Sequence, residues 1–121
     1  MKNDNLFINM NYLEEALLNA KEALLEVINS FIENIPNEML QLTLFIQEPD
    51  FELIKQKAHK IKASFSIVGM KAAADLCYQL EISAKNNSLA EVKSIFLKLE
   101  DQYESGYKEL KQYKEKIMCR I

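Results

Sequence analysis

Apolar residues recur at intervals of three and four along most of this chain, and very little interrupts them. Of 121 residues only two are glycine and two are proline, which leaves too few turn-forming residues for an all-β fold. Intervals of three and four put residues on one face of an α-helix, since the helix turns once every 3.6 residues. The sequence therefore predicts an all-α fold of long amphipathic helices.

The first part of the chain predicts one short helix and one long helix. A weak capping signal indicates a short helix near 12–18, and a long helix is expected from about Ala20. Pro36 lies inside the long helix and removes one backbone hydrogen bond, so we expect either a kink or a short break there. The apolar face of this helix is expected to comprise Leu24, Ile28, Phe31, Ile35, Leu42 and either Phe45 or Ile46.

The rest of the chain predicts three further long helices. Asp50 is a good N-cap for a helix that stops at Gly69. The next helix is expected at 71–85, and the last begins at a capping box made by Ser88 and Glu91. Helices of this kind with short loops bury their apolar faces best as an antiparallel up-and-down four-helix bundle, here with a short extra N-terminal helix.

Length and composition restrict the function. The whole chain, 1–121, fits a single domain, with residues 1–10 expected as a loose N-terminal arm. The formal net charge of -3 gives no general case for binding nucleic acid or an anionic membrane, and no apolar run is long enough for membrane insertion. Cys77 and Cys119 match no metal-site spacing. We therefore expect a reduced, cytoplasmic and monomeric protein without a metal.

His59 is the only histidine, and helical spacing predicts that it faces solvent. On a helical wheel it lies about 140° from the centre of the apolar arc of its helix. That arc comprises Ile54, Ala58, Ile61, Phe65 and Val68. The side of the helix that carries His59 also carries Lys55, Gln56, Lys62, Ala63 and Ser66.

Four lysines surround His59 in the sequence, at 55, 57, 60 and 62, with no acidic residue among them. An exposed imidazole is mostly neutral at pH 7 and is then a competent nucleophile. An ammonium such as that of Lys62, one turn further along, can stabilise the negative oxygens of a transferring phosphoryl group. A lone exposed histidine on a lysine-rich helix is also what an ordinary solvated surface gives, and the residues alone leave both interpretations open.

Three segments, in order, resemble those of histidine-containing phosphotransfer (HPt) domains. Residues 58–69 read AHKIKASFSIVG, similar to the phosphorylation motif Ala-His-x-Leu-Lys-Gly-Ser followed by a spacer and an apolar-Gly pair. Residues 76–81 read LCYQLE and residues 31–36 read FIENIP, similar to Leu-Cys-x-x-Leu-Glu and Phe-Leu-Glu-x-x-Pro. The resemblance covers about residues 20–100. Ala63 departs from the pattern, because the family usually has glycine there.

The resemblance implies a function in phosphorelay signal transduction. His59 would accept a phosphoryl group and exchange it with the aspartate of a response-regulator receiver domain, and a sensor or hybrid histidine kinase would be the other partner. Lys62 would stabilise the phosphoryl group, and Glu81 would hydrogen-bond the imidazole. The chain would carry no cofactor and would not be an enzyme, since Mg²⁺ and most catalytic groups belong to the receiver. The surface expected to bind partners comprises Lys55, Gln56, Ala63 and Ser66.

Two other functions remain open at this point. One is the phosphoacceptor domain of a chemotaxis-type histidine kinase, although nothing after Ile121 supports an ATP-binding domain. The other is a helical-bundle adaptor that binds partners without phosphate. A metal or hydrolytic site is poorly supported, because one histidine and dispersed acids offer no catalytic group.

Overall fold

The computed structural model describes residues 21–119, and within that range every regular element is an α-helix. The predicted all-α fold is therefore confirmed. The predicted short helix near 12–18 and the arm at 1–10 lie outside the described residues. The four long helices are α2 (Lys21–Gln47), α3 (Phe51–Ile67), α4 (Lys71–Lys85) and α5 (Leu89–Cys119).

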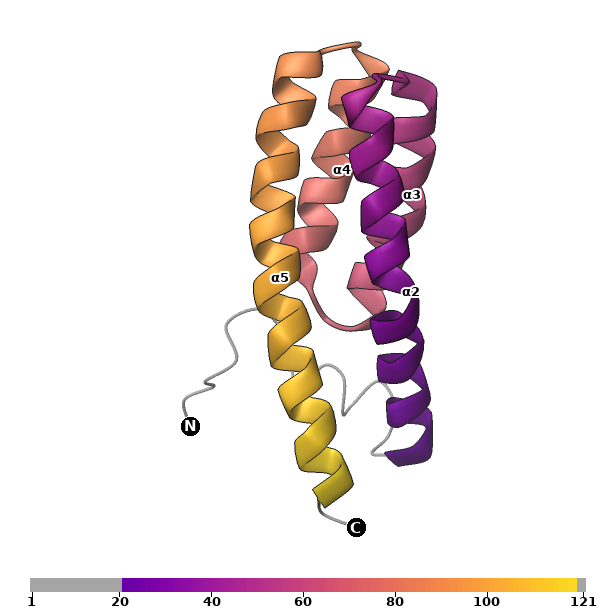
Figure 1. The fold of residues 1–121 in the computed structure, drawn as a ribbon, viewed down its shortest axis with the longest axis vertical. Coiled ribbons are helices and arrows are strands. Elements are labelled where there is room, and N and C mark those ends of the chain that lie inside the picture. Colours follow the sequence, from indigo (N-terminus) through magenta and orange to yellow (C-terminus); the bar gives the residue numbers. More distant parts are fainter. Residues whose placement is uncertain (1–20, 120–121) are drawn as a thin grey trace.

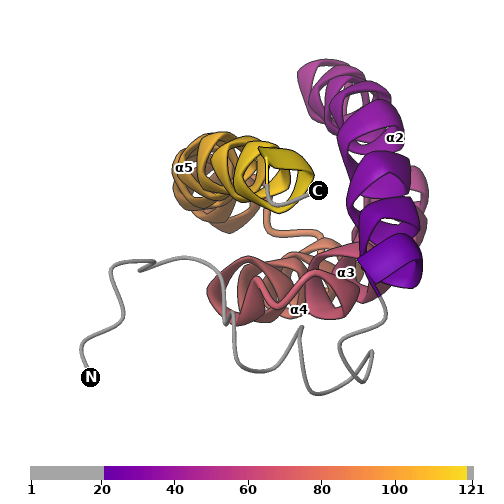
Figure 2. The same cartoon turned by 90° about the horizontal axis from the view of Figure 1, so that it is seen from below.

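Consecutive helices run in opposite directions and are joined by short loops at 48–50, 68–70 and 86–88. Figure 1 shows that α2 and α5 extend past the loop joining α3 to α4. The end-on view in Figure 2 shows the helices packed around a common centre, with α3 beside both α2 and α4. The antiparallel up-and-down bundle is thus as predicted, and α3, which carries the histidine, has a neighbour on each side.

Helix α3 begins and ends where its sequence predicts. Asp50 caps the first turn, where its Oδ1 accepts a hydrogen bond from the Leu53 amide at 3.1 Å. This bond satisfies one of the amides that a helix start leaves without a partner. At the other end Gly69 adopts a φ of 78°, a left-handed conformation that glycine reaches without a steric cost. These two features set where α3 begins and ends.

Pro36 does not break α2, which continues through it from Lys21 to Gln47. Proline has no N–H, so the carbonyl of Ile32, four residues earlier, loses its usual helical donor. The hydroxyl of Tyr107 on α5 donates a hydrogen bond to that carbonyl at 3.2 Å. A residue 75 positions away thus satisfies the group that Pro36 leaves free, and it ties α2 to α5.

The start of α5 differs in one detail from the expected capping box. Ser88 directly precedes the helix, as predicted, but the Glu91 carboxylate accepts a 3.2 Å hydrogen bond from the Ser83 hydroxyl on α4. Further along α5, Gly106 lies against Met70. A Cβ at Gly106 would overlap the Met70 side chain, which explains why a residue of low helix propensity stands inside a long helix.

The core confirms the predicted apolar face of α3, whose residues Ile54, Ala58, Ile61 and Phe65 are fully buried. Phe65 is the centre of an aromatic group, with its ring centroid 5.6 Å from that of Phe31 and 6.4 Å from that of Tyr103. On α2, Ile46 is buried and Phe45 only partly so. Burial of these four α3 residues on one face forces the opposite face of α3 toward solvent.

Candidate functional site

His59 lies in the middle of α3, on the face predicted from the helical wheel. Its side chain is 70% exposed, whereas the neighbouring Ala58 and Ile61 are fully buried. The imidazole is therefore open to a second molecule, while the helix that holds it is fixed by the core. This combination suits a residue that must react with a partner and keep its position.

The imidazole is bound to a carboxylate from the next helix. Nδ1 of His59 lies 3.0 Å from Oε2 of Glu81 on α4. An ionised carboxylate can only accept hydrogen bonds, so Nδ1 carries the proton and donates it. In the neutral ring the other nitrogen, Nε2, then holds the free lone pair. The contact expected for Glu81 is thus present, and it leaves the lone pair of the neutral ring on Nε2.

Glu81 also binds Lys62. The Nζ atom of Lys62 lies 3.1 Å from Oε1 of Glu81, so the two carboxylate oxygens are divided between the lysine and the histidine. The same ammonium stands over the ring of Tyr78, 5.2 Å from its centroid. We call His59, Lys62 and Glu81 the Glu81 cluster. It places an imidazole and an ammonium on one carboxylate, on the exposed edge between α3 and α4.

Two of the four lysines that surround His59 in the sequence do not belong to this site. Lys57 and Lys60 turn toward α2, where both bind Glu38. Lys57 is largely buried there and also donates a hydrogen bond to Gln41. Sequence spacing could not reveal this pairing, because it depends on how α2 packs against α3. We call Glu38, Lys57 and Lys60 the Glu38 cluster.

The pKa of Glu38 depends on its burial and on the two lysines that it binds. Burial by itself would raise the pKa of Glu38, but the hydrogen bonds and charges of Lys57 and Lys60 outweigh it and lower the pKa below the ordinary 4.5. The carboxylate therefore stays ionised to a lower pH than an ordinary glutamate does. This cluster is a structural tie between α2 and α3.

The residues expected to bind partners are exposed or half-exposed. Ala63 and Ser66 are exposed on α3. Lys55 pairs with Glu52 at 3.4 Å, and Gln56 donates a hydrogen bond to the same carboxylate. Beside His59 the surface is hollowed between α3 and α4, with a lining of Lys55, Gln56, His59, Tyr78, Glu81, Ile82 and Lys85.

The sequence reasoning missed Tyr78 and Ile82, which are 55% and 42% exposed. They lie on one face of α4 together with Glu81, because Tyr78 precedes Glu81 by three residues and Ile82 by four. That spacing was readable once Glu81 was singled out. Their contact with the His59 side of α3 was not, since it depends on the packing of α4 against α3.

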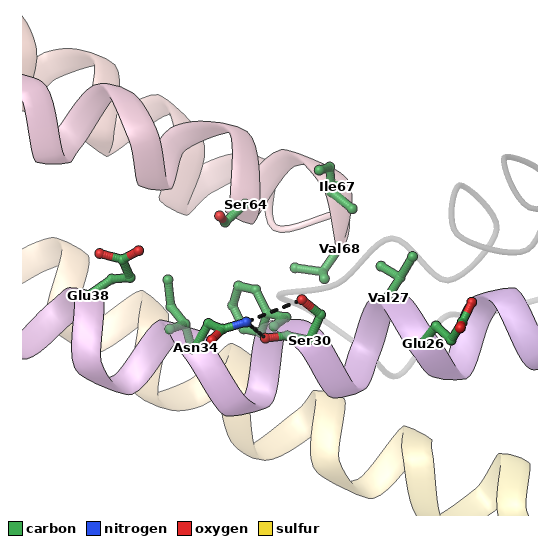
Figure 3. A pocket seen from close by; sticks show the side chains of 10 residues that line it. Glu26, Val27, Ser30, Asn34, Glu38, Ser64, Ile67 and Val68 are labelled. Atoms are coloured by element: carbon green, nitrogen blue, oxygen red, sulfur yellow. Dashed lines mark hydrogen bonds between the residues drawn. The ribbon is translucent and has the colours of Figure 1, made fainter.

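A second pocket lies outside this site. This pocket of about 320 Å³ lies between α2 and α3, and its lining does not include His59. Figure 3 shows its Ser64 and Val68 facing Asn34 and Ser30, with the hydrogen bonds from Asn34 to Ser30 drawn.

In the part of the chain that the structure describes, His, Cys, Asp and Glu form no group of three that could hold a metal ion. None of the helices from α2 to α5 is long and apolar enough to span a membrane.

Comparisons with known proteins show the family of this chain. A model of the family described as "Hpt domain" matches residues 26–112, which include all of the Glu81 cluster. The phosphorelay intermediate protein rdeA of Dictyostelium discoideum is 26% identical over 94 residues, which are 78% of this chain. The chain spans 37% of the length of that relative.

The fold is also that of a solved structure. The crystal structure of histidine-containing phosphotransfer protein B (HptB) from Pseudomonas aeruginosa PAO1 matches with a TM-score of 0.84. The match covers 92% of this chain and 96% of that chain at 18% identity, and it supports the fold. Because the family model covers most of the chain, the chain belongs to the Hpt domain family, the phosphorelay class that its sequence motif indicated.

Proposed function

We propose that this chain is a phosphorelay intermediate that carries a phosphoryl group on Nε2 of His59. The single observation that carries the proposal is the Glu81 cluster. An exposed imidazole has its Nδ1 proton held by Glu81 at 3.0 Å, and the same carboxylate anchors the Lys62 ammonium at 3.1 Å. The donor and acceptor are the aspartates of response-regulator receiver domains, which in turn connect the chain to a sensor or hybrid histidine kinase.

The transfer step follows from the tautomer that Glu81 holds. The Nε2 lone pair attacks the phosphorus of the receiver's aspartyl phosphate in line with the bond that breaks. An N–P bond forms, the acyl P–O bond breaks, and its electrons remain on the aspartate carboxylate. The imidazole then carries a phosphoryl group on Nε2 and a proton on Nδ1, so the ring becomes positive. The Glu81 carboxylate stabilises that positive ring through the Nδ1–H hydrogen bond.

Lys62 supplies the charge that the phosphoryl group requires. Negative charge is spread over the three equatorial phosphoryl oxygens in the transition state, and a nearby ammonium stabilises it. Among the residues that the structure describes, the Glu81 cluster offers no further group for the chemistry, and we expect Mg²⁺ and the remaining catalytic groups to come from the receiver. The chain is accordingly a carrier that uses its partner's catalysis, and it acts as a cytoplasmic monomer without a cofactor.

The test is phosphotransfer from a set of phosphorylated receiver domains to the purified chain. The wild type is expected to take up phosphate from at least one receiver, and a His59→Gln variant to take up none while keeping its helical circular dichroism. Uptake by His59→Gln would show that the phosphate resides elsewhere. Partner binding without uptake by the wild type would favour the helical-bundle adaptor.

A further inference from the structure

Lys62 is held by two groups of different kinds. The Nζ atom of Lys62 lies 3.1 Å from Oε1 of Glu81, and it stands over the face of the Tyr78 ring at 5.2 Å from the centroid. The side chain is 31% exposed, against 64% for Lys60, which directly follows His59 and binds Glu38 on α2. Lys62 is thus the more restrained of the two lysines, although both reach toward solvent.

The two holding groups respond differently to a phosphoryl group. Glu81 competes with it, because the ammonium cannot keep a full ion pair with the carboxylate and also bind phosphoryl oxygens. The electron-rich face of the Tyr78 ring attracts the cation as a whole, and this attraction does not require one particular N–H bond. The ring can therefore hold Lys62 near His59 both before and after the ammonium changes its anionic partner.

We propose that Tyr78 is a positioning residue for Lys62. In the unloaded chain the ammonium lies between Glu81 and the Tyr78 ring. When His59 is loaded, the ammonium leaves Oε1 of Glu81 for the phosphoryl oxygens and stays over the ring. This inference rests on the proposed function and deepens it, since it assigns a role to an aromatic side chain that is 55% exposed and adds nothing to the core.

The exposure of Tyr78 makes the proposal testable without unfolding the chain. The probe is potassium phosphoramidate, a small donor that needs no docking surface. Its N–P bond breaks with release of ammonia as the bond to Nε2 forms. Tyr78→Leu should load about two- to fivefold more slowly than the wild type, the range expected for loss of an exposed cation–π contact. Tyr78→Phe keeps the ring and should load at the wild-type rate.

Two controls separate positioning from a general surface effect. Leu97→Ala removes an exposed apolar side chain on α5, away from the hollow beside His59, and should leave loading unchanged. In a Lys62→Gln background, Tyr78→Leu should cause no further loss, because the cation it holds is gone. The proposal is overturned if Tyr78→Leu loads normally, if Tyr78→Phe or Leu97→Ala loses as much, or if the loss persists without Lys62.

A second measurement keeps this inference distinct from the proposed function. The Lys62 Hε protons over the Tyr78 ring should show an upfield ring-current shift in NMR spectra, absent in Tyr78→Leu and retained after loading. If the wild type is never loaded by phosphoramidate or by receivers, the proposed function fails, and the NMR shift still decides whether Tyr78 holds Lys62. Absence of the shift in the wild type would refute the positioning role directly.

Discussion

On each side of α3 one carboxylate binds two basic side chains, but the two clusters differ in the chemistry and exposure of those side chains. Toward α2, Glu38 binds two basic side chains, Lys57 and Lys60. Toward α4, Glu81 also binds two, His59 and Lys62. In the Glu38 cluster the central contact is buried, with Lys57 12% and Glu38 16% exposed, whereas His59 in the Glu81 cluster is 70% exposed.

The Glu81 cluster differs from the Glu38 cluster in containing a histidine and in the exposure of that histidine. A lysine offers only donors, so the Glu38 cluster can tie helices together but cannot attack phosphorus. A histidine bound through Nδ1 keeps a lone pair on Nε2, and exposure makes that atom accessible. The Glu38 cluster should therefore govern stability, and the Glu81 cluster should govern phosphotransfer.

The largest effect short of removing His59 is expected from Lys62. Lys62→Gln should slow phosphotransfer from a phosphorylated receiver by about ten- to a hundredfold, since it removes a cation that stabilises transition-state charge. Rapid-quench measurement of transfer gives the rate. The matched control is Lys60→Gln, which removes an equal charge from the other cluster and should leave the rate unchanged. Equal losses in both variants would mean that general positive charge matters and that the two sides are alike.

A smaller effect, on stability, is expected from the two carboxylates. Glu38→Ala leaves Lys57 largely buried without its ionic partner and should lower the free energy of unfolding by about 2–3 kcal/mol, measured by urea titration. Glu81→Ala should lower it by less than about 1 kcal/mol, because His59 and Lys62 can be solvated. If Glu81→Ala destabilises as much as Glu38→Ala, the Glu81 cluster is a structural tie as well.

The smallest effect is expected from pH. Because the pKa of Glu38 is lowered in the folded chain, its ion pairs add stability above the ordinary pKa of the unfolded carboxyl. That stability is lost as the pH falls through the lower folded pKa. The free energy of unfolding should therefore decrease on acidification below about pH 5, and the decrease should be weaker in Glu38→Gln. An identical pH profile in the variant would contradict an electrostatic contribution of Glu38 to stability.

Only some features of the two clusters and of α3 could be predicted from the sequence. Local rules predicted the ends of α3 from Asp50 and Gly69 and the outward direction of His59, because each depends on a few neighbouring residues. The family motif indicated Lys62 and Glu81. The partner of Lys57, the hydrogen bond from Tyr107 to Ile32 and the place of Tyr78 over Lys62 were not predictable. Each depends on the register between two packed helices.

The central claim is that Glu81 holds the Nδ1 proton of His59 and leaves Nε2 to accept phosphate. NMR spectroscopy of the ¹⁵N-labelled imidazole before and after loading tests it most directly. The account predicts that phosphorus couples to Nε2, while the Nδ1 proton persists and its resonance changes in Glu81→Gln. Phosphorus on Nδ1, or on any residue other than His59, would contradict the account.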